Sequence, residues 1–528
     1  MKKIFATLLC PVLLAGCSFL DEENYTEFDS GTFFKDPKNV EYVVNGCYDQ
    51  LQQVAPALHV HTEIPTDYVC VSPNKQNASE TLWHNGVFSY NDSYPTNTWE
   101  RLYSLIYNCN YLIDNIGQAT LDEQLRNRYV AEARFLRGWA YLMLTNLFRD
   151  VPLRTTSAYK NAMYDEPLTS QEKIYDFLIE DLEYAEAHLY EFSFGRSFPE
   201  GTGIYDDGER MRASVDAAIG MQALAYLYRA GNDSSSPWWE KARDKAAQLI
   251  ERCGGAGAAL SSGWLADSYY GLFHGTTRYG QENLFAVYYS NSAKGEGSNI
   301  ANNWAIYTRY SKAVNAGFRR FTNQWYQKHF AGHYDKRNAE GLMHEIQNNA
   351  GAKFIFPDLT NFTIDVGVAP GEGYTNPIGS NPTAKAYGPW LSKYNDENAP
   401  SSGCCETGLV LLRYADVLLI FAEAENELSP ASAAAYEALN AVRARAGVGD
   451  APAGMDQAAF RTFVLEERER EFFGESKRLF DLNRREMYGT KIRESATATE
   501  YANVNRERNY EVKWFDIPKV EVDANRAL

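Results

Sequence analysis

Two blocks of helical periodicity, separated by a long stretch without it, constrain the fold of this 528-residue chain most strongly. In the first block, from about Val40 to Arg252, apolar residues recur three and four positions apart, as on one face of an amphipathic helix. A clear stripe of this kind is Ala133, Leu136, Ala140, Leu144 and Leu147. The second block, from about Leu409 to Glu486, repeats the pattern. The chain is therefore expected to be mostly α-helical.

Capping and turn residues predict where helices of the first block begin and end. Thr169 and Glu172 have the spacing of a capping box, so a helix is expected to open at Thr169. Residues 213–229 and 238–252 are expected to form an antiparallel pair, because the segment between them is polar and rich in turn residues.

In the second block, apolar residues from Val410 to Leu428 predict one unbroken helix. Pro430 is expected to start the next helix, and Gly447 to lie just past its end. Helices of similar length joined by short turns favour stacked helical hairpins of the tetratricopeptide type, although the chain has no strict repeat of about 34 residues.

The middle of the chain, residues 254–408, is rich in Gly, Asn, Ser and aromatic residues. Short apolar runs such as 284–288 predict strands, but most of this region is expected to be loop. A long irregular stretch inside a compact protein is more often functional than idle. This region is therefore expected to carry the ligand-binding surface.

The N-terminus has the pattern of an export signal. Lys2 and Lys3 precede an apolar run, residues 4–14, that is shorter than the roughly 20 residues of a membrane span. Leu14-Ala15-Gly16-Cys17 resembles a bacterial lipobox, so Cys17 is expected to become the acylated first residue, with palmitate-type chains. An ordinary signal peptide with a chance cysteine is the alternative. Two or more acyl chains would anchor the mature protein stably.

Charge and cysteine content limit the possible partners. The formal net charge is −18, and an acidic surface repels phosphate backbones, so nucleic-acid binding is not expected. A neutral or weakly charged ligand fits better. Of the eight cysteines, Cys10 lies in the signal and Cys17 is acylated, and the sequence does not fix how the others pair. The absence of a CxxC pair argues against a zinc or redox centre.

Metal ligands are weakly indicated. His59-x-His61 and His329-x-x-x-His333 have compatible spacings, but neither pair has an evident third ligand, so no metal site is expected. Asp206-Asp207-Gly208-Glu209 could favour a structural calcium ion through its oxygen ligands, with an ordinary polar turn as the alternative. No cofactor is expected.

Several stretches of the chain, taken in order, form a recognisable pattern. They are 132–141 followed by Asp150-Val151-Pro152-Leu153, 412–419 followed by Ala422-Glu423-Ala424, 439–447, 467–472 leading to 478–482, and Phe515-Asp516-Ile517-Pro518 with Asn525. Together they resemble the RagB/SusD family of outer-membrane nutrient-binding lipoproteins. The ordered set spans nearly the whole mature chain. Arg149 departs from the family pattern, because it stands where a Gly is usual, and Asp516 and Arg526 stand where Pro is common.

The resemblance and the periodicity together divide the chain. Residues 1–16 are the signal peptide, 17–39 the acylated tether and N-terminal extension, 40–253 the N-terminal SusD-like helical region, 254–408 the loop-rich ligand-binding region, and 409–528 the C-terminal helical hairpins and tail. The expected fold is mostly α, with tetratricopeptide-like stacked hairpins and an irregular ligand-binding region inserted between them.

The resemblance also implies a function. A protein of this kind would be lipid-anchored at the surface of the outer membrane, would capture oligosaccharides, and would deliver them to a SusC-like TonB-dependent transporter without a catalytic step. A binder of peptides or another non-sugar nutrient in the same role is one alternative. An all-α glycoside hydrolase, which would need two carboxyl groups at a fixed separation, is another.

Aromatic residues are the main candidates for ligand binding, because a flat ring covers the apolar face of a sugar while polar neighbours bind its hydroxyls. The candidates in the middle region are Trp264, Tyr269, Tyr270, Asn302 and Trp304. The loop from Pro65 to Thr98, which lies in a part of the chain that contributes to the ligand surface in the resembled family, adds Trp83, His84 and Tyr94. The alternative for each ring is a place in the core.

Charged residues of the family-like stretches are expected to be structural. They are Arg413, Asp416, Glu423, Arg443 and Glu467. Charges between packed helices persist only when they are paired and hydrogen-bonded. A catalytic acid–base pair is the alternative.

Overall fold

The computed structural model of the chain describes residues 33–71, 93–157, 165–190, 212–274, 280–289, 297–298, 300, 304, 319–330, 332–343, 345–347, 353–355, 389–396, 405–496 and 514–528. The signal peptide with Cys17, the acidic turn 206–209, and the candidates Trp83, His84 and Asn302 lie outside these residues.

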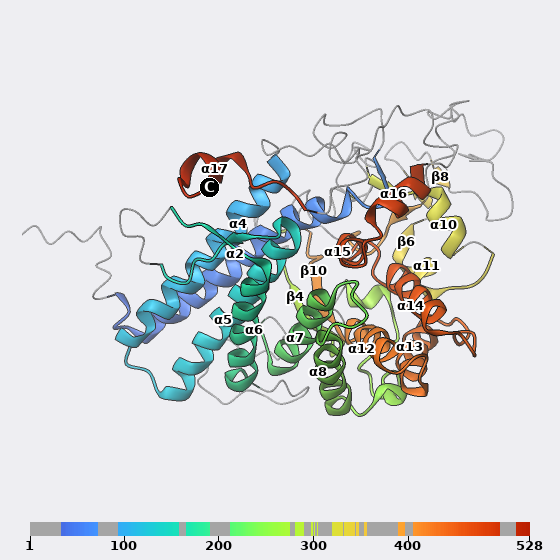
Figure 1. Cartoon of the computed structure of the whole chain (residues 1–528), viewed down its shortest axis with the longest axis horizontal. Coiled ribbons are helices and arrows are strands. Elements are labelled where there is room, and N and C mark those ends of the chain that lie inside the picture. The colour runs from blue at the N-terminus through green and yellow to red at the C-terminus, as the bar shows by residue number, and fades with distance from the viewer. Residues whose placement is uncertain are drawn as a thin grey trace, which may run out of the picture.

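Helices stacked side by side form the scaffold (Figure 1). In chain order they are α2 (Pro37–Glu63), α4 (Ser93–Asn115), α5 (Glu123–Phe148), α6 (Gln171–His188), α7 (Val215–Ala230) and α8 (Trp238–Arg252), each packed on the next. The stack continues through α12 (Tyr414–Leu428), which packs on α8, and through α13 (Ala433–Arg445) and α14 (Gln457–Glu471), which pack on α12. The expected mostly helical, stacked-hairpin architecture is confirmed.

Helix α5 shows why the pattern predicted this scaffold. Its stripe of Ala133, Leu136, Ala140, Leu144 and Leu147 is buried against neighbouring helices. Asp122 caps the helix by accepting a hydrogen bond from the Leu125 amide at 2.8 Å. A Cβ atom at Gly138 would lie 3.2 Å from the Leu178 carbonyl oxygen, so the small residue permits the close approach of α5 and α6.

The expected antiparallel pair at 213–229 and 238–252 is present as α7 and α8, joined by a turn in which Gly231 has a φ of +64°. The prediction that a capping box at Thr169 opens the next helix is wrong. Thr169 lies in β3 (Leu168–Thr169), which pairs with β2 (Val151–Pro152). Helix α6 begins only at Gln171, whose amide donates to Asp150 Oδ1 at 2.9 Å, so a distant carboxylate binds the first turn.

The unbroken helix expected from Val410 is also wrong at its start. Residues Leu409–Arg413 form strand β10, which pairs antiparallel with β4 (Asn283–Val287), and α12 begins at Tyr414. Both faces of β10 are buried, so its continuous apolar run resembles the start of a helical stripe.

The next helix starts later than expected. Helix α13 begins at Ala433, with Ser432 as its cap, rather than at Pro430, because Ala431 between them takes a φ of +48°. Gly447 lies past the end of α13 with a φ of +71°, as predicted.

The described part of the middle region consists of short elements. Beyond β4 they are β5 (Arg319–Phe321) paired with β1 (Val69–Val71), β6 (Leu342–Met343) paired with β9 (Trp390–Leu391), β7 (Glu345–Gln347) paired with β8 (Lys353–Ile355), α10 (Asn323–His329) and α11 (Lys336–Gly341). The 3-10 turns η2 (Ala256–Ala258) and η3 (Tyr270–Leu272) also lie in this region, whereas η1 (Ile116–Gln118) follows α4. The strand expected at 284–288 corresponds to β4.

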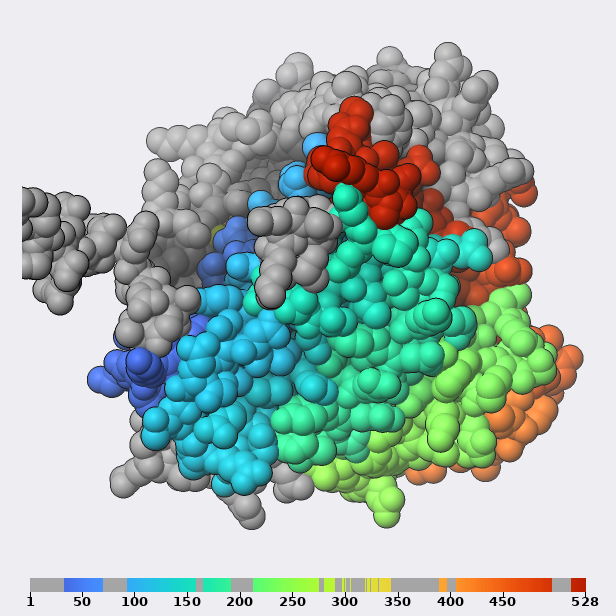
Figure 2. Space-filling model, turned by 60° about the vertical axis from the view of Figure 1, so that its left-hand side comes forward, coloured from blue at the N-terminus to red at the C-terminus, as the bar shows by residue number. Residues whose placement is uncertain are grey.

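After α14 come α15 (Arg478–Arg484), α16 (Tyr488–Ala496) and α17 (Lys519–Ala524). The last of these returns to the N-terminal half, where Glu521 accepts hydrogen bonds from Trp99 Nε1 at 3.2 Å and Arg154 Nη2 at 2.6 Å. Figure 2 shows the C-terminal segment, in red, lying across one end of the helix stack. Among the residues described, no helix combines the length and apolar character that crossing a membrane requires.

Candidate functional site: an aromatic segment on a buried ionic network

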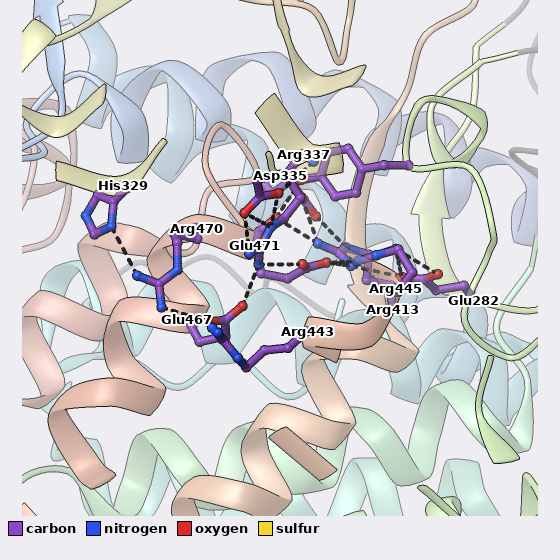
Figure 3. A network of polar contacts seen from close by, with 12 residues as sticks. Glu282, His329, Asp335, Arg337, Arg413, Arg443, Arg445, Glu467, Arg470 and Glu471 are labelled. Carbon is purple, nitrogen blue, oxygen red and sulfur yellow. Dashed lines mark hydrogen bonds and ion pairs between the residues drawn. The ribbon is translucent and has the colours of Figure 1, made fainter. Parts of the chain in front are cut away.

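A buried network of ion pairs joins the middle region to the C-terminal helices (Figure 3). Arg413, at the end of β10, contacts Glu282 Oε1 at 2.9 Å, Glu471 Oε1 at 2.5 Å and Glu475 Oε2 at 2.9 Å. Arg445 of α13 pairs with Glu282 and with Glu471. All five side chains are essentially inaccessible to solvent. The network therefore fixes strand β4, strand β10 and helix α14 to one another.

The network continues along α14. Arg337 Nη1 lies 2.7 Å from Glu467 Oε1 and 3.3 Å from Glu471 Oε2. The other oxygen of Glu467 contacts Arg443 and Arg470, each at 2.7 Å. Helices α11, α13 and α14 are thus joined through one carboxylate.

Local charge keeps these carboxylates ionised. Burial would raise the pKa of Glu471, but Arg445, Arg413 and Arg337 outweigh it and lower the pKa to about 2. Burial opposes ionisation of Glu467 in the same way, and Arg337, Arg470 and Arg443 hold its pKa well below the ordinary value. Removing one partner of such a pair costs about 3–5 kcal/mol, because the other charge stays buried.

The expectation that the family-like charged residues are paired between helices is confirmed. Asp416 accepts a hydrogen bond from the Arg413 amide at 3.1 Å, as the N3 residue of a capping box on α12. Glu423 contacts Arg484 at 2.6 Å and also pairs with Arg485. Each of these carboxylates is buried and is bonded to a cationic side chain or a backbone amide, as in a structural network.

An aromatic segment, residues 264–274, lies on this network. Its buried anchor is Tyr269, whose hydroxyl donates to the Glu471 carbonyl oxygen at 2.6 Å. Lys393 Nζ lies 4.7 Å and Arg445 Cζ 5.0 Å from the centre of the Tyr269 ring, which is the geometry of cation–π contacts. Tyr269 is fully buried, so the expectation of an exposed ring at this position is wrong.

The next residue, Tyr270, is 40 % exposed. Its ring stacks on His274 with centroids 3.8 Å apart and an angle of 13° between the planes. Its amide donates to Glu340 Oε2 at 2.7 Å, and Ser268 Oγ binds the same oxygen at 3.1 Å. Tyr270 and His274 thus form a stacked aromatic pair near the surface, and the backbone of Tyr270 is hydrogen-bonded to Glu340.

Trp264 begins the segment. Its ring is half-buried and tilted by 48° against Tyr414, with centroids 5.6 Å apart. Two residues later, the Ala266 amide donates to Glu282 Oε2 at 2.6 Å, which ties the segment directly to the network. The segment is therefore bonded to Glu282 at Ala266 and to Glu340 at Ser268 and Tyr270.

The structure separates the remaining candidates from this segment. Trp304 is 1 % exposed, donates through Nε1 to His59 Nδ1 at 3.3 Å, and stacks on Phe321, so it is a core residue and not the exposed ring expected. Tyr94 is half-buried in the first turn of α4. Trp83, His84 and Asn302 fall outside the described residues.

The histidine pairs are used for packing. His59 and His61 are completely buried, and burial lowers the pKa of each to about 3. His329 contacts Glu469 at 3.3 Å and Arg470 at 3.3 Å. Across the part of the chain that the structure describes, no group of three His, Cys, Asp or Glu side chains could hold a metal ion. Cys47, Cys109, Cys253 and Cys405 are buried thiols.

Sequence reasoning missed some residues of this site. His274 follows Tyr270 by four positions, a spacing that brings side chains together in helical turns and could have suggested the stacked pair. Arg445 lies two residues after Arg443 on α13, and side chains at this spacing do not face the same side of a helix, so the pattern did not indicate it. Glu282 and Lys393 lie in the aperiodic middle region, where no pattern distinguishes them.

Comparison with known proteins places this fold in one family of helical proteins. A sequence model described as "SusD family" matches residues 269–528, and a second, described as "Starch-binding associating with outer membrane", matches residues 18–193. Together they cover most of the chain, in both of its halves. The chain belongs to the SusD family.

Similar proteins share modest sequence identity over most of the chain. "SusD-like protein P25" of Formosa agariphila is 24% identical over an alignment 516 positions long, which covers 88% of this chain and 86% of that protein. A crystal structure of a SusD homolog from Bacteroides thetaiotaomicron matches with a TM-score of 0.77 and 24% identity, over 96% of this chain and 99% of that one. A laminarin-binding SusD-like protein matches with a TM-score of 0.67 and 18% identity, over 93% and 98%. These structures share the fold.

Proposed function

We propose that this protein is a cell-surface glycan-binding lipoprotein that captures oligosaccharides and delivers them to a SusC-like TonB-dependent transporter in the outer membrane. Two observations carry the proposal: the family membership seen in both halves of the chain, and the exposed ring of Tyr270, which stacks on the half-buried His274. The family descriptions combine starch binding with outer-membrane association, and a structural neighbour is described as laminarin-binding.

The chemistry of the aromatic segment fits a sugar. Tyr270 offers a flat apolar ring with a hydroxyl at its edge, and such rings suit ligands with one apolar and one wet side. The stacked His274 holds the ring, and Glu340 holds the backbone of Tyr270. A ring that is already fixed loses little conformational freedom when a ligand binds, so more of the contact energy remains as affinity. Trp264 is the second ring of the proposed surface.

The lipobox-like Leu14-Ala15-Gly16-Cys17 supports attachment to the outer membrane through acyl chains on Cys17. Replacing Cys17 with Ala is expected to release the protein from the membrane fraction. Continued membrane attachment of this variant after a high-salt wash would contradict a lipid anchor. Purification of the acylated protein in detergent is expected to bring down a TonB-dependent transporter, and recovery of the protein alone would count against delivery to one.

A glycan array probed with the chain lacking residues 1–17 tests capture directly. Binding of neutral oligosaccharides without cleavage of labelled substrate supports the proposal. Binding of peptides alone would favour a non-sugar nutrient in the same role, and release of shorter sugars would favour a glycoside hydrolase. Laminarin and starch oligosaccharides are the first ligands to test, because the comparisons name them.

A further inference from the structure

Two cysteines lie opposite each other where helices α2 and α4 pack together. Asn108 Nδ2 donates to the Gly46 carbonyl oxygen at 3.3 Å, and Arg101 Nη1 donates to Gln53 Oε1 at 3.1 Å. From Gln53 to Gly46 the chain of α2 runs back by as many positions as α4 runs forward from Arg101 to Asn108. The two helices are therefore antiparallel, and these contacts fix their register. Gly46 and Asn108, which face each other, are each followed by a cysteine.

Both cysteines, Cys47 and Cys109, lie in the buried contact between the helices. Their exposed fractions are 1 % and 0 %. Cys47 lies between Val44 and Leu51 in the buried stripe of α2, and Cys109 lies one turn before Leu112 in that of α4. A hydrogen bond joins the two thiols. The sulfur atoms are thus already in contact, although the residues are about 60 positions apart in the chain.

This arrangement meets the main requirement of a disulfide. Two cysteines can be bridged without movement of the backbone only when their Cα atoms are close and their side chains point toward each other. The thiol–thiol hydrogen bond between Cys47 and Cys109 shows that these side chains point toward each other across the two helices. The short side chain of Asn108 reaches the backbone of α2 beside them, so the helices are close at this level.

The folded environment protects the thiols from reaction. Burial raises the pKa of the Cys109 thiol, and the hydrogen bond with Cys47 raises it further. Because the thiolate is the reactive form, a buried thiol of this kind is inert toward an oxidant in solution. A bond between Cys47 and Cys109 therefore forms while the chain folds, before α2 and α4 exclude the oxidant.

We propose that Cys47 and Cys109 form a disulfide in the exported protein, which joins α2 to α4. The oxidant is an accessible disulfide, that of a thiol–disulfide oxidoreductase or of oxidised glutathione. One cysteine thiolate attacks it to form a mixed disulfide, and the second cysteine displaces the remaining thiol. The pair loses two protons and two electrons as its S–S bond forms, and the S–S bond of the oxidant becomes two thiols.

The inference rests on the export that is part of the proposed function, because disulfides persist in oxidising compartments. Such a bond would act as a structural crosslink. It would close a loop of about 60 residues in the unfolded chain and lower the entropy of that state. The folded protein would be stabilised, with no change at the aromatic segment.

Peptide mapping of the protein purified from the membrane fraction tests the bond. Free thiols are blocked with iodoacetamide in denaturant, and the chain is cut with trypsin without reduction. Cleavage after Lys and Arg places Cys47 in peptide 39–75 and Cys109 in peptide 102–126. Mass spectrometry is expected to find these two peptides linked, and to find them separate after reduction.

Two variants assign the link, because Cys70 shares the peptide 39–75 with Cys47. Cys70→Ser is expected to keep the link, and Cys47→Ser is expected to lose it. If Cys47→Ser does not fold, fragmentation of the linked wild-type peptides identifies which cysteine is bonded. A link through Cys70, or iodoacetamide on both Cys47 and Cys109 in wild type, would overturn the proposal.

Thermal unfolding tests the effect on the fold. The chain lacking residues 1–17, refolded with oxidised glutathione, is expected to unfold about 2–4 °C higher than the same chain refolded with a phosphine reductant. The double variant Cys47→Ala/Cys109→Ala is expected to lose this difference. Cys253→Ala, which removes a buried thiol elsewhere, is the matched control and is expected to keep it. A difference of equal size in the double variant would overturn the role of this pair.

The results also separate this inference from the proposed function. Glycan binding by a membrane-attached protein whose Cys47 and Cys109 are both alkylated would overturn the disulfide and leave the proposed function standing. A linked pair in a protein that binds no glycan would support the disulfide and contradict glycan capture.

Discussion

Arg413 and Glu471 contact each other twice, through side chain and backbone. Arg413 Nη1 lies 2.5 Å from Glu471 Oε1, and Arg413 Nη2 donates to the Glu471 carbonyl oxygen at 2.9 Å. The same carbonyl accepts the hydroxyl of Tyr269, the anchor of the aromatic segment. The residue that ends α14 is therefore the point at which the scaffold and the proposed binding surface meet.

Replacing Arg413 with Ala is expected to lower the free energy of unfolding by about 3–5 kcal/mol, because Glu471 and Glu475 would stay buried without this partner. Denaturant unfolding measures the loss. Arg243→Ala is the control, since Arg243 makes only partly exposed ion pairs and its loss is expected to change stability little. The folded fraction of Arg413→Ala is expected to keep the glycan preference of wild type. Unchanged stability with lost binding would overturn the structural role.

Replacing Tyr270 with Ala is expected to weaken oligosaccharide binding by up to about tenfold, because stacking on one aromatic ring contributes about 0.5–1.5 kcal/mol in comparable aromatic contacts. Isothermal titration calorimetry measures the change. Tyr42→Ala is the matched control: Tyr42 is 65 % exposed on α2, outside the aromatic segment, and its loss is expected to leave affinity unchanged. Equal affinities of the two variants would remove Tyr270 from the proposed surface.

Arg149 has a φ of +68° at the end of α5, a conformation that strains residues other than glycine. This explains why the family usually has Gly there. Arg149→Gly is expected to be more stable than Arg149→Ala by about 1 kcal/mol, since both lose the contact of the guanidinium with Trp514 and only Ala keeps the strain.

Ala434→Gly, at an exposed position inside α13, is expected to show the opposite preference and to lower stability by about 0.5–1 kcal/mol. Thermal unfolding of the three variants and wild type gives both comparisons. An Arg149→Ala variant as stable as Arg149→Gly would mean that position 149 is not strained.

Local pattern predicted much of this fold, and distant contacts decided the rest. The stripe on α5 and the pair α7–α8 follow from helical periodicity, which is a property of neighbouring residues. Strand β10 does not, because its apolar run is explained by burial on both faces and by pairing with β4, more than 100 residues earlier in the chain.

In the candidate site, too, local pattern indicates some features and distant contacts decide the others. Tyr269 and Tyr270 are identical residues in consecutive positions, yet one is fully buried and the other is 40 % exposed. The difference arises because Tyr269 reaches Glu471, 202 positions away, which no local pattern encodes. Trp304 is likewise buried through a contact that is distant in sequence, because its Nε1–H donates to His59 Nδ1. Composition could indicate an aromatic-rich region, but it could not separate anchors from exposed rings.

His61 is expected to make the protein sensitive to acid. Its ring is completely buried, 4.3 Å from that of Phe515, and burial lowers its pKa from 6.5 to about 3. Between these values the unfolded chain binds a proton that the folded chain does not, so the stability that the neutral ring contributes is complete above pH 6.5 and is lost as pH falls towards 3. Glu63 acts in the opposite direction, because burial raises its pKa to about 7.

Replacing His61 with Leu isolates the contribution of His61, since the Glu63 effect is common to wild type and variant. The free energy of unfolding of the variant, relative to wild type, is expected to stay constant above pH 6.5 and to rise steadily as pH is lowered to 4. Urea unfolding at a series of pH values measures the difference, and a His61→Leu curve parallel to wild type between pH 6.5 and 4 would show that His61 is not held neutral in the folded state.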